Sequence, residues 1–580
     1  MKKFKRVEKR VLLAVGLWVA CLTWCTPSAH AAGVYLNSPS NGATVAGTVS
    51  IATSIDPGVT WIDLYIDSKF IAPSPPFTFT WDTTTVGNGV HTISVAAFNN
   101  TGQVGTASIT VTVNNAAAGG TSYYVASGGK DSNSGTSQSS AWLTVNRVNS
   151  ASLKPGDTVF FQAGQMWRGT LLPSRGGIPG APITYAAFGT GNQPVISGAD
   201  VVKPWTQSNG SIYSAPLSAS PGNVFVDGGP PWGYKAASSV AAMAAGTWFW
   251  DSAAQLLYVW LYDSSNPTGH TVEAATREYG FYVNSGICDD LSYITINGLT
   301  FQRSYGYGIY FHCFGGNTPL TGVVIENNTV RQTGTRQVDG GQYYNGVFFL
   351  QEPWYAGAAP QILNNAISYT GGHGNGINLQ GADGAVISGN NVSNWNHNGI
   401  DIKDADGVLI DSNIVHDQPS SGSALYAEQS QETVQRNIVY NASNGIQVSV
   451  GTSANVYNNS IYNSPTGIYY GPTATAIVAE NNAVKGSATS FGTDGSPGLT
   501  EDYNDWGANP KLSIGPNRYT FAQWLALGSH LHDLAADPMF TSPPGNMNLL
   551  QGSPCINAGI NVSLPYNGSA PDLGAMESSF

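Results

Sequence analysis

The sequence predicts an all-β protein, most of which is a solenoid of short parallel strands that follows a smaller β-sandwich. The solenoid is predicted by a phrase of the form Gly-Ile-x-Ile-x, which recurs roughly every 22 to 25 residues, and by an Asn that recurs once in each unit. The sandwich is predicted by short alternating apolar segments near the amino terminus, separated by Pro, Gly and Asn turns. The 69 Gly residues also favour turns over helices.

The repeated phrase marks successive strands on one side of the solenoid. Side chains alternate along a strand, so the two apolar residues of each phrase point into the coil and the x positions point out. Asn tolerates the left-handed backbone conformation and its amide can bond the units above and below, so the recurring Asn predicts a ladder at a tight turn. The phrases begin at Gly308, Gly346, Gly376, Gly399, Ala424, Gly445 and Gly467, and the recurring residues are Asn328, Asn365, Asn390, Asn413, Asn437, Asn459 and Asn482.

These repeats resemble the right-handed parallel β-helix of the pectate-lyase superfamily. The resemblance covers roughly residues 280–482 and implies a β-helix over residues 272–498. It is specific for the fold and much less so for the chemistry.

The amino terminus reads as a secretory signal peptide over residues 1–31. It has a basic start, an apolar run from Val11 to Cys21 and the small-x-small end Ala29-His30-Ala31. A lipoprotein signal at Cys25 remains an alternative, although Trp24 stands where a small residue is normally required. We expect a secreted, extracellular or cell-surface protein without membrane insertion, because no later apolar run is long enough to span a bilayer.

The remaining segments are assigned in order. Residues 34–115 resemble bacterial Ig-like domains through phrases such as SPSNGATVAGTVSI, and residues 116–121 form a small, Gly-containing linker. Residues 122–199 resemble the amino-terminal cap and first coils of secreted bacterial β-helix proteins. The Trp-rich residues 200–271 are expected to fold as a β-rich insertion, and residues 499–580 as a carboxyl cap with one short helix, Phe521–Leu527.

The net negative charge of the chain restricts the classes of molecule that it can bind. The chain carries 23 basic and 35 acidic residues, and loss of six basic residues and Glu8 with the signal peptide leaves a net charge of −17. We therefore expect no nucleic-acid binding and a monomer that acts on a polysaccharide. Ca²⁺ could bind Asp383, Asp404 and Asp406, but Asp-Gly is first a turn pair, so no metal ligand is assigned. Cys288 and Cys313 lie about one coil apart, but the strand register places them at different positions in their coils, so no disulfide is predicted.

Charged residues gather at one place on the outward face of the coils, where Asp401, Lys403 and Glu428 lie on neighbouring strands. Strand geometry places Asp401 and Glu428 on a diagonal of roughly 8 Å. This is within the range of about 6.5 to 9.5 Å expected of an inverting carboxylate pair. The alternative is a solvated surface ion pair between Lys403 and Glu428.

Aromatic and amide side chains near these charges predict a sugar-binding groove, because apolar sugar faces stack on rings. His373 and His397 enter consecutive strands at nearly equivalent positions and could be a base, a metal pair or turn residues. The candidate substrate-binding residues are Tyr310, His312, Asn378, Gln380, His373, Tyr344 and Trp354.

The resulting hypothesis is a secreted enzyme that cleaves glycosidic bonds by hydrolysis or elimination. Hydrolysis needs one of Asp401 and Glu428 protonated and the other able to activate water. Elimination would use Lys403 and neighbouring amides to neutralise a uronate, His397 or Lys403 as base, and Tyr426 as acid. The alternative from another class is a non-catalytic glycan-binding or adhesin-like solenoid.

Overall fold

The computed structural model describes residues 33–67, 69–74, 78–83, 89–99, 102–113, 119–285, 288–314, 319–334, 344–352, 359–418, 422–495 and 498–579. The chain divides into two compact units, residues 1–115 and 116–580, and both are built of strands. The predicted signal peptide and Trp354 lie outside the described residues. No helix in the described part is long and apolar enough to cross a membrane.

The first unit is a β-sandwich whose two sheets enclose one core. Alternation buries Ile51, Ile62, Leu64 and Ile93 between the sheets while their neighbours face solvent. One sheet has the order β1 (Val34–Ser38), β3 (Thr48–Ile55), β6 (Thr78–Asp82), and the other β2 (Ala43–Val45), β8 (Gly102–Val113), β7 (Gly89–Asn99), β4 (Trp61–Ile66), β5 (Lys69–Ser74).

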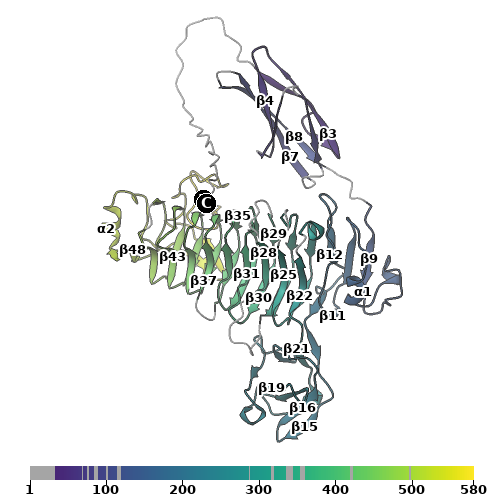
Figure 1. Ribbon diagram of the computed structural model, residues 1–580. Coiled ribbons are helices and arrows are strands. Elements are labelled where there is room, and N and C mark those ends of the chain that lie inside the picture. The colour runs from purple at the N-terminus through teal and green to yellow at the C-terminus, as the bar shows by residue number, and fades with distance from the viewer. Residues whose placement is uncertain are drawn as a thin grey trace, which may run out of the picture. The chain divides into compact units, whose positions relative to one another are not determined.

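The second unit is a parallel β-solenoid, and its central coils, from β23 (Ile294–Asn297) to β45 (Ala483–Lys485), each contribute one strand to each of three long sheets (Figure 1). The twelve-stranded sheet contains β9 (Ser122–Val125), β10 (Thr158–Gln162), β12 (Ile183–Phe188), β23 (Ile294–Asn297), β26 (Val324–Glu326), β29 (Gln361–Leu363), β32 (Val386–Ser388), β35 (Asp406–Asp411), β38 (Gln431–Gln435), β41 (Ser453–Tyr457), β44 (Ala476–Glu480) and β47 (Leu499–Asp502). The ten-stranded sheet contains β11 (Met166–Arg168), β13 (Val195–Ser197), β24 (Thr300–Gln302), β27 (Thr329–Thr333), β30 (Ala366–Thr370), β33 (Asn391–Trp395), β36 (Ile414–His416), β39 (Ile438–Tyr440), β42 (Ser460–Tyr462) and β45 (Ala483–Lys485).

The eleven-stranded sheet carries the repeated Gly-Ile-x-Ile-x phrases. Its inward residues, for example Ile400 and Ile402, are fully buried, as the alternation predicts. It contains β22 (Tyr279–Ser285), β25 (Tyr307–Phe314), β28 (Val347–Glu352), β31 (Ile377–Gln380), β34 (Ile400–Lys403), β37 (Ser423–Glu428), β40 (Asn444–Val448), β43 (Thr466–Tyr470), β46 (Thr489–Thr493), β48 (Leu512–Ile514) and the antiparallel edge β49 (Asn517–Tyr519).

The predicted Asn ladder is confirmed. The side-chain oxygen of Asn413, for example, accepts bonds from the backbone N–H and the side-chain amide of Asn390, at 3.0 and 2.9 Å. The same pair of bonds joins each ladder Asn to the next, and the column extends to Asn504. Every coil is thereby fixed to its neighbour at the same corner.

The left-handed conformation falls one residue before each ladder Asn. Positive φ angles fall on the preceding residue, such as Asn364 (54°), Ser412 (56°) and Arg436 (53°). The preceding residue makes the sharp turn, and the ladder Asn, back in ordinary conformation, points its amide along the solenoid axis.

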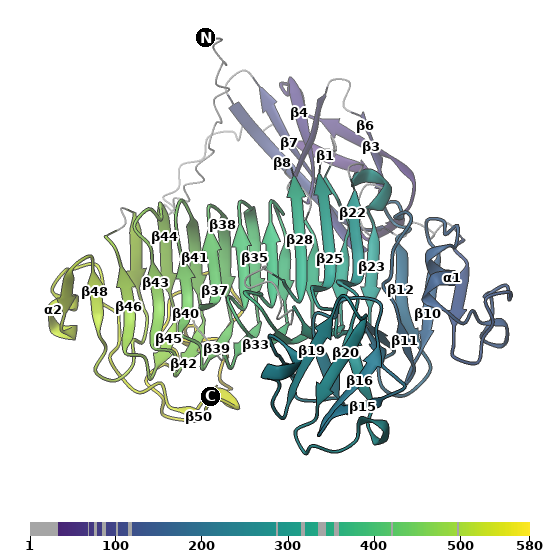
Figure 2. The ribbon, with the colours of Figure 1, turned by 60° about the horizontal axis from the view of Figure 1, so that its bottom comes forward.

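The insertion after β13 forms a small unit on the side of the solenoid (Figure 2). It has its own core around Trp248, Leu257 and Val259. Its sheets contain β14 (Ala199–Val201), β21 (Val272–Ala275) and β17 (Val224–Val226), and β15 (Thr206–Asn209), β16 (Ile212–Pro216), β20 (Leu256–Trp260), β19 (Thr247–Asp251) and β18 (Lys235–Ala236).

Short helices and one hairpin complete the second unit. The helix predicted at Phe521 is present as α2 (Phe521–Leu525), with a capping box between Thr520 and Gln523. The others are α1 (Val145–Asn149), η2 (Gln138–Ser140), η3 (Val240–Ala242), η4 (Pro267–Gly269) and η5 (Cys288–Leu291), and the hairpin is β50 (Phe540–Ser542) with β51 (Asn546–Leu549).

The expectation of no disulfide is corrected at Cys313, which is disulfide-bonded on β25. On the neighbouring strand β22, the residue paired with Cys313 is Ser285.

Candidate functional site

The candidate site lies on the outer face of the eleven-stranded sheet, where two columns of outward side chains cross the coils. The strand register confirms that the x positions of successive repeated phrases lie side by side on the outer face. Asp401 is paired with Tyr426, and Lys403 with Glu428. The neighbouring pairs are Asn378–Asp401, Gln380–Lys403, Tyr426–Gln447 and Gln447–Tyr469.

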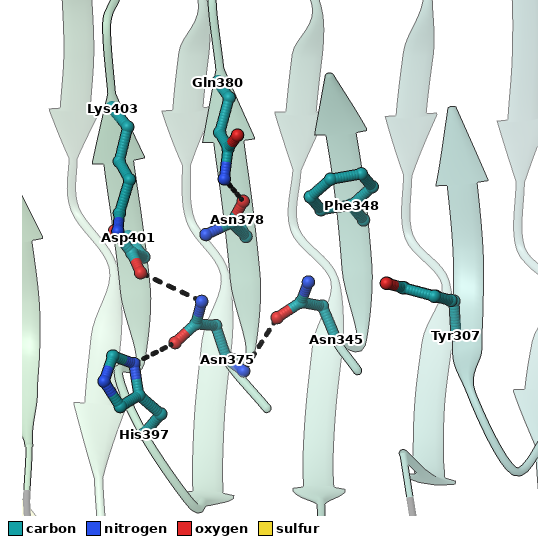
Figure 3. A pocket seen from close by; sticks show the side chains of 9 residues that line it. All are labelled: Tyr307, Asn345, Phe348, Asn375, Asn378, Gln380, His397, Asp401 and Lys403. Carbon is teal, nitrogen blue, oxygen red and sulfur yellow. Dashed lines mark hydrogen bonds between the residues drawn. The ribbon is translucent and has the colours of Figure 1, made fainter. Parts of the chain in front are cut away.

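Two cavities, of about 380 and 390 Å³, open side by side on this face, and both are lined by His397 and Lys403. Together they form a groove, here called the amide groove, that runs across β28, β31, β34, β37 and β40. The first cavity is lined by Tyr307, Asn345, Phe348, Asn375, Asn378, Gln380, His397, Asp401 and Lys403 (Figure 3), and the second by His397, Asn398, Lys403, Gly422, Ser423, Tyr426 and Gln447.

Asp401 is the most unusual group in the amide groove. It stands in an outward column, yet it is only 1% exposed. Its Oδ2 accepts bonds from the side-chain amides of Asn375 (2.9 Å) and Asn398 (3.2 Å), whereas Oδ1 is buried without a hydrogen-bond partner. Burial raises the pKa of the carboxyl group, although the charge of Lys403 opposes this. A buried carboxyl group with one bonded and one unbonded oxygen is suited to hold a proton on Oδ1.

A second, shorter ladder positions these amides. The Asn375 N–H donates to Oδ1 of Asn345, the Asn398 N–H to Oδ1 of Asn375, and the Ser423 N–H to Oδ1 of Asn398, each at 2.9 Å. These residues precede the strands of the groove, so their free amide ends reach Asp401 from the side. The sequence analysis missed them, although an Asn-Gly pair stands before β28, β31 and β34.

His397 is held as a neutral ring. Its Nδ1 lies 3.1 Å from Oδ1 of Asn375, an oxygen that can only accept, so Nδ1 carries the proton. Burial lowers the pKa of His397, against the charge of Asp401. His373 is close enough to influence that pKa, but it is exposed in a turn and lines neither cavity.

Lys403 and Glu428 form the predicted ion pair, with Nζ 3.5 Å from Oε2. Burial lowers the pKa of Lys403, but the charges of Asp401 and Glu428 outweigh burial, so the pKa is raised and the ammonium stays charged. The Tyr426 hydroxyl donates to Oε2 of Glu428 at 3.3 Å, and Lys403 Nζ lies 5.9 Å from the centre of the Tyr426 ring. Burial raises the pKa of Tyr426.

Of the predicted substrate-binding residues, the structure brings Asn378 and Gln380 into the amide groove. Tyr310 and His312 lie on β25 beside the groove and bond each other at 3.2 Å, without lining either cavity. Tyr344 is buried against Tyr307. Those three side chains therefore support the wall rather than form it.

The aromatic wall itself consists of Tyr307 and Phe348, which the sequence analysis did not assign to the site. Phe348 is the last ring of a stack of three. Its centroid lies 5.2 Å from that of Tyr310, and the centroid of Tyr310 lies 5.5 Å from that of Tyr282. Stacking fixes the ring of Phe348 at the edge of the cavity. The sequence did carry a signal for Phe348, because it stands at the first outward x position of the repeated phrase that begins at Gly346.

Metal ligands do not converge in the amide groove as far as the structure describes it. Asp383, Asp404 and Asp406 form no close ligand group. Within the described residues one such group exists, Glu501 with His530 and Asp533, buried near the carboxyl end of the solenoid. Its carboxylates already accept N–H bonds from neighbours: Asn504, Trp506 and Trp524.

Comparison with known proteins agrees with this architecture. Residues 354–500 match a family model described as a right handed beta helix region, and residues 34–95 match one described as a bacterial Ig domain. A lacto-N-biosidase of Bifidobacterium longum subsp. longum is 38% identical over 96 residues, which are 16% of this chain and 6% of that protein. The present chain therefore spans only a small part of the curated relative that it matches.

Solved structures resemble the chain with low sequence identity. A structure titled as the complex of XylC with xylose has 16% identity and a TM-score of 0.45, over 64% of this chain and 69% of that one. The pectate lyase Pel9A has 17% identity and a TM-score of 0.41, over 79% and 96% of the two chains. A GH136 lacto-N-biosidase from Eubacterium ramulus has 12% identity and a TM-score of 0.34, over 68% and 65%. The two family models identify a bacterial Ig domain and, after it, a right-handed β-helix region in this chain.

Proposed function

We propose that the protein is a secreted polysaccharide-active enzyme that hydrolyses glycosidic bonds in the amide groove. The observation that carries this proposal is the buried carboxyl group of Asp401, which lines a groove of amides and rings and whose Oδ1 has no hydrogen-bond partner. Catalysis by general acid requires a carboxyl group that keeps its proton near neutral pH, and burial pushes the pKa of Asp401 in that direction.

In this mechanism Asp401 gives its Oδ1 proton to the glycosidic oxygen as the bond between this oxygen and the anomeric carbon breaks. Glu428 takes a proton from a water molecule, whose oxygen forms the new bond to the anomeric carbon. One water is consumed, and each product gains a hydroxyl group. Glu428 is paired with Lys403 on the neighbouring strand, and Lys403 is two residues after Asp401. The backbones of Asp401 and Glu428 are therefore roughly 8 Å apart on the diagonal, which suits inversion.

Lys403 separates hydrolysis from elimination. A lyase needs a base that is deprotonated near neutral pH and a cation available to neutralise a uronate. Neutral His397 could serve as the base, but Lys403, the one permanent cation among the described residues that line the two cavities, is already paired with Glu428 and is not available to a uronate. The described groove therefore supports hydrolysis better than elimination.

The experiment is to incubate the purified protein with neutral and acidic polysaccharides and to record reducing ends together with ultraviolet absorbance. We expect reducing ends without unsaturated products, and loss of these products in Asp401→Asn. Unsaturated ends would show a lyase. Binding without any product over long incubation would show a non-catalytic glycan-binding solenoid.

A further inference from the structure

We propose that the amide groove binds a neutral glycan and discriminates against polyuronates. This inference rests on the proposed function of the groove, but it concerns binding and can be tested without turnover. It follows from the charges, the amides and the rings that line the two cavities.

The charges leave no cation for a uronate. Among the described residues that line either cavity, Lys403 is the one with a permanent positive charge. Its ammonium is already paired with Glu428, with Nζ 3.5 Å from Oε2. A uronate carboxylate would have to displace Glu428 from Lys403 and would then lie beside the displaced carboxylate, which is unfavourable in a partly buried site.

The amides fit hydroxyl groups instead. Four amide side chains line the first cavity, and an amide presents both donors and an acceptor, as a sugar hydroxyl does. Gln380 Nε2 donates to Oδ1 of Asn378 at 3.2 Å, which fixes both side chains and leaves Nδ2 of Asn378 and Oε1 of Gln380 outside this bond. A row of fixed amides can bind several hydroxyl groups without carrying charge.

The rings supply an apolar contact at one end of the row. Phe348 and Tyr307 line the same cavity as Asn378 and Gln380, and the stack behind Phe348 holds its ring in place. A pyranose ring presents an apolar face and hydroxyl edges, so it can contact an aromatic ring and the amides together. The structure thus assigns a sugar subsite between Phe348 and Asp401.

The test measures binding to Asp401→Asn, so that hydrolysis does not consume the ligand. Neutral xylo-, manno- and gluco-oligosaccharides, together with oligogalacturonates and oligoalginates, are titrated by calorimetry at low and at physiological salt. We expect at least one neutral series to bind, and the uronates to bind about tenfold more weakly or not at all.

A charge variant tests the reason for the preference. Gln380 is paired with Lys403 in the sheet, on the side away from Glu428, so Gln380→Lys adds a cation without an acidic partner beside it. We expect its affinity for uronates to rise at least tenfold at low salt and to fall as salt screens the charge. The control Asn455→Lys adds the same charge at an exposed position of β41, outside the groove, and should leave uronate binding unchanged.

The outcomes separate the two proposals. Preferential binding of uronates by the Asp401→Asn protein, with unchanged melting temperature, would overturn the neutral-glycan inference, whether or not the wild type is a hydrolase. Binding of a neutral glycan by a wild type that releases no product would support the inference and remove the proposed function. Failure to bind any member of either class would contradict both.

Discussion

Removal of one rung of the long Asn ladder should destabilise the solenoid strongly. In Asn413→Ala four buried hydrogen bonds are lost, because Oδ1 accepts two bonds from Asn390 and Nδ2 donates to Asn437 Oδ1 (3.0 Å) and Ile387 O (2.9 Å). At about 0.5 to 1.5 kcal/mol for each bond, the free energy of unfolding should fall by about 2 to 6 kcal/mol.

Guanidinium unfolding followed by circular dichroism gives this difference. The matched control is Asn455→Ala, because Asn455 is exposed on β41 of the same solenoid, outside the ladder, and should change stability by less than about 0.5 kcal/mol. The ladder would not be a stabilising element if Asn413→Ala unfolded with the same midpoint as this control.

Three further predictions concern the carboxyl end, Lys403 and the first unit. Burial raises the pKa of Glu501 to about 7 and that of Asp533 to about 9, from ordinary values of about 4, so the stability that these groups give the fold is full below about pH 4 and is lost as the pH rises from there to about 7 for Glu501 and about 9 for Asp533. The melting temperature should fall over that interval, and Glu501→Gln should flatten the fall; an equally steep profile in the variant would contradict this. In Lys403→Ala the loss of a cation raises the pKa of Asp401 further, so the alkaline limb of the activity profile should move to higher pH; a move to lower pH would argue against Asp401 as the acid. Residues 119–579, produced without the first unit, should melt cooperatively and close to the β-helix transition of the full chain, because the two units have separate cores; calorimetry checks this, and loss of cooperative melting would refute it.

The fold and the strand register were predictable because one period sets both. A unit of fixed length with alternating side chains determines which residues face out and which lie next to each other, so Asp401 and Tyr426 could be paired from the sequence alone. The ladder was predictable for the same reason, since one Asn stands at a constant place in each unit.

The state of Asp401 was not predictable from this pattern. Alternation places the residue on the outside, but its burial depends on amides that enter from the turns of two coils, Asn375 and Asn398. Where a turn side chain points depends on the stacked coils and not on strand alternation.

The most direct test of the account is the activity of Asp401→Asn on a neutral glycan that the wild type hydrolyses. The amide keeps the size of the carboxyl group but cannot donate an acidic proton, so kcat should fall by about 10²- to 10⁴-fold. Glycan affinity and melting temperature should stay near those of the wild type. An Asp401→Asn protein that hydrolyses the same glycan at the wild-type rate would contradict the assignment of Asp401 as the proton donor of the amide groove.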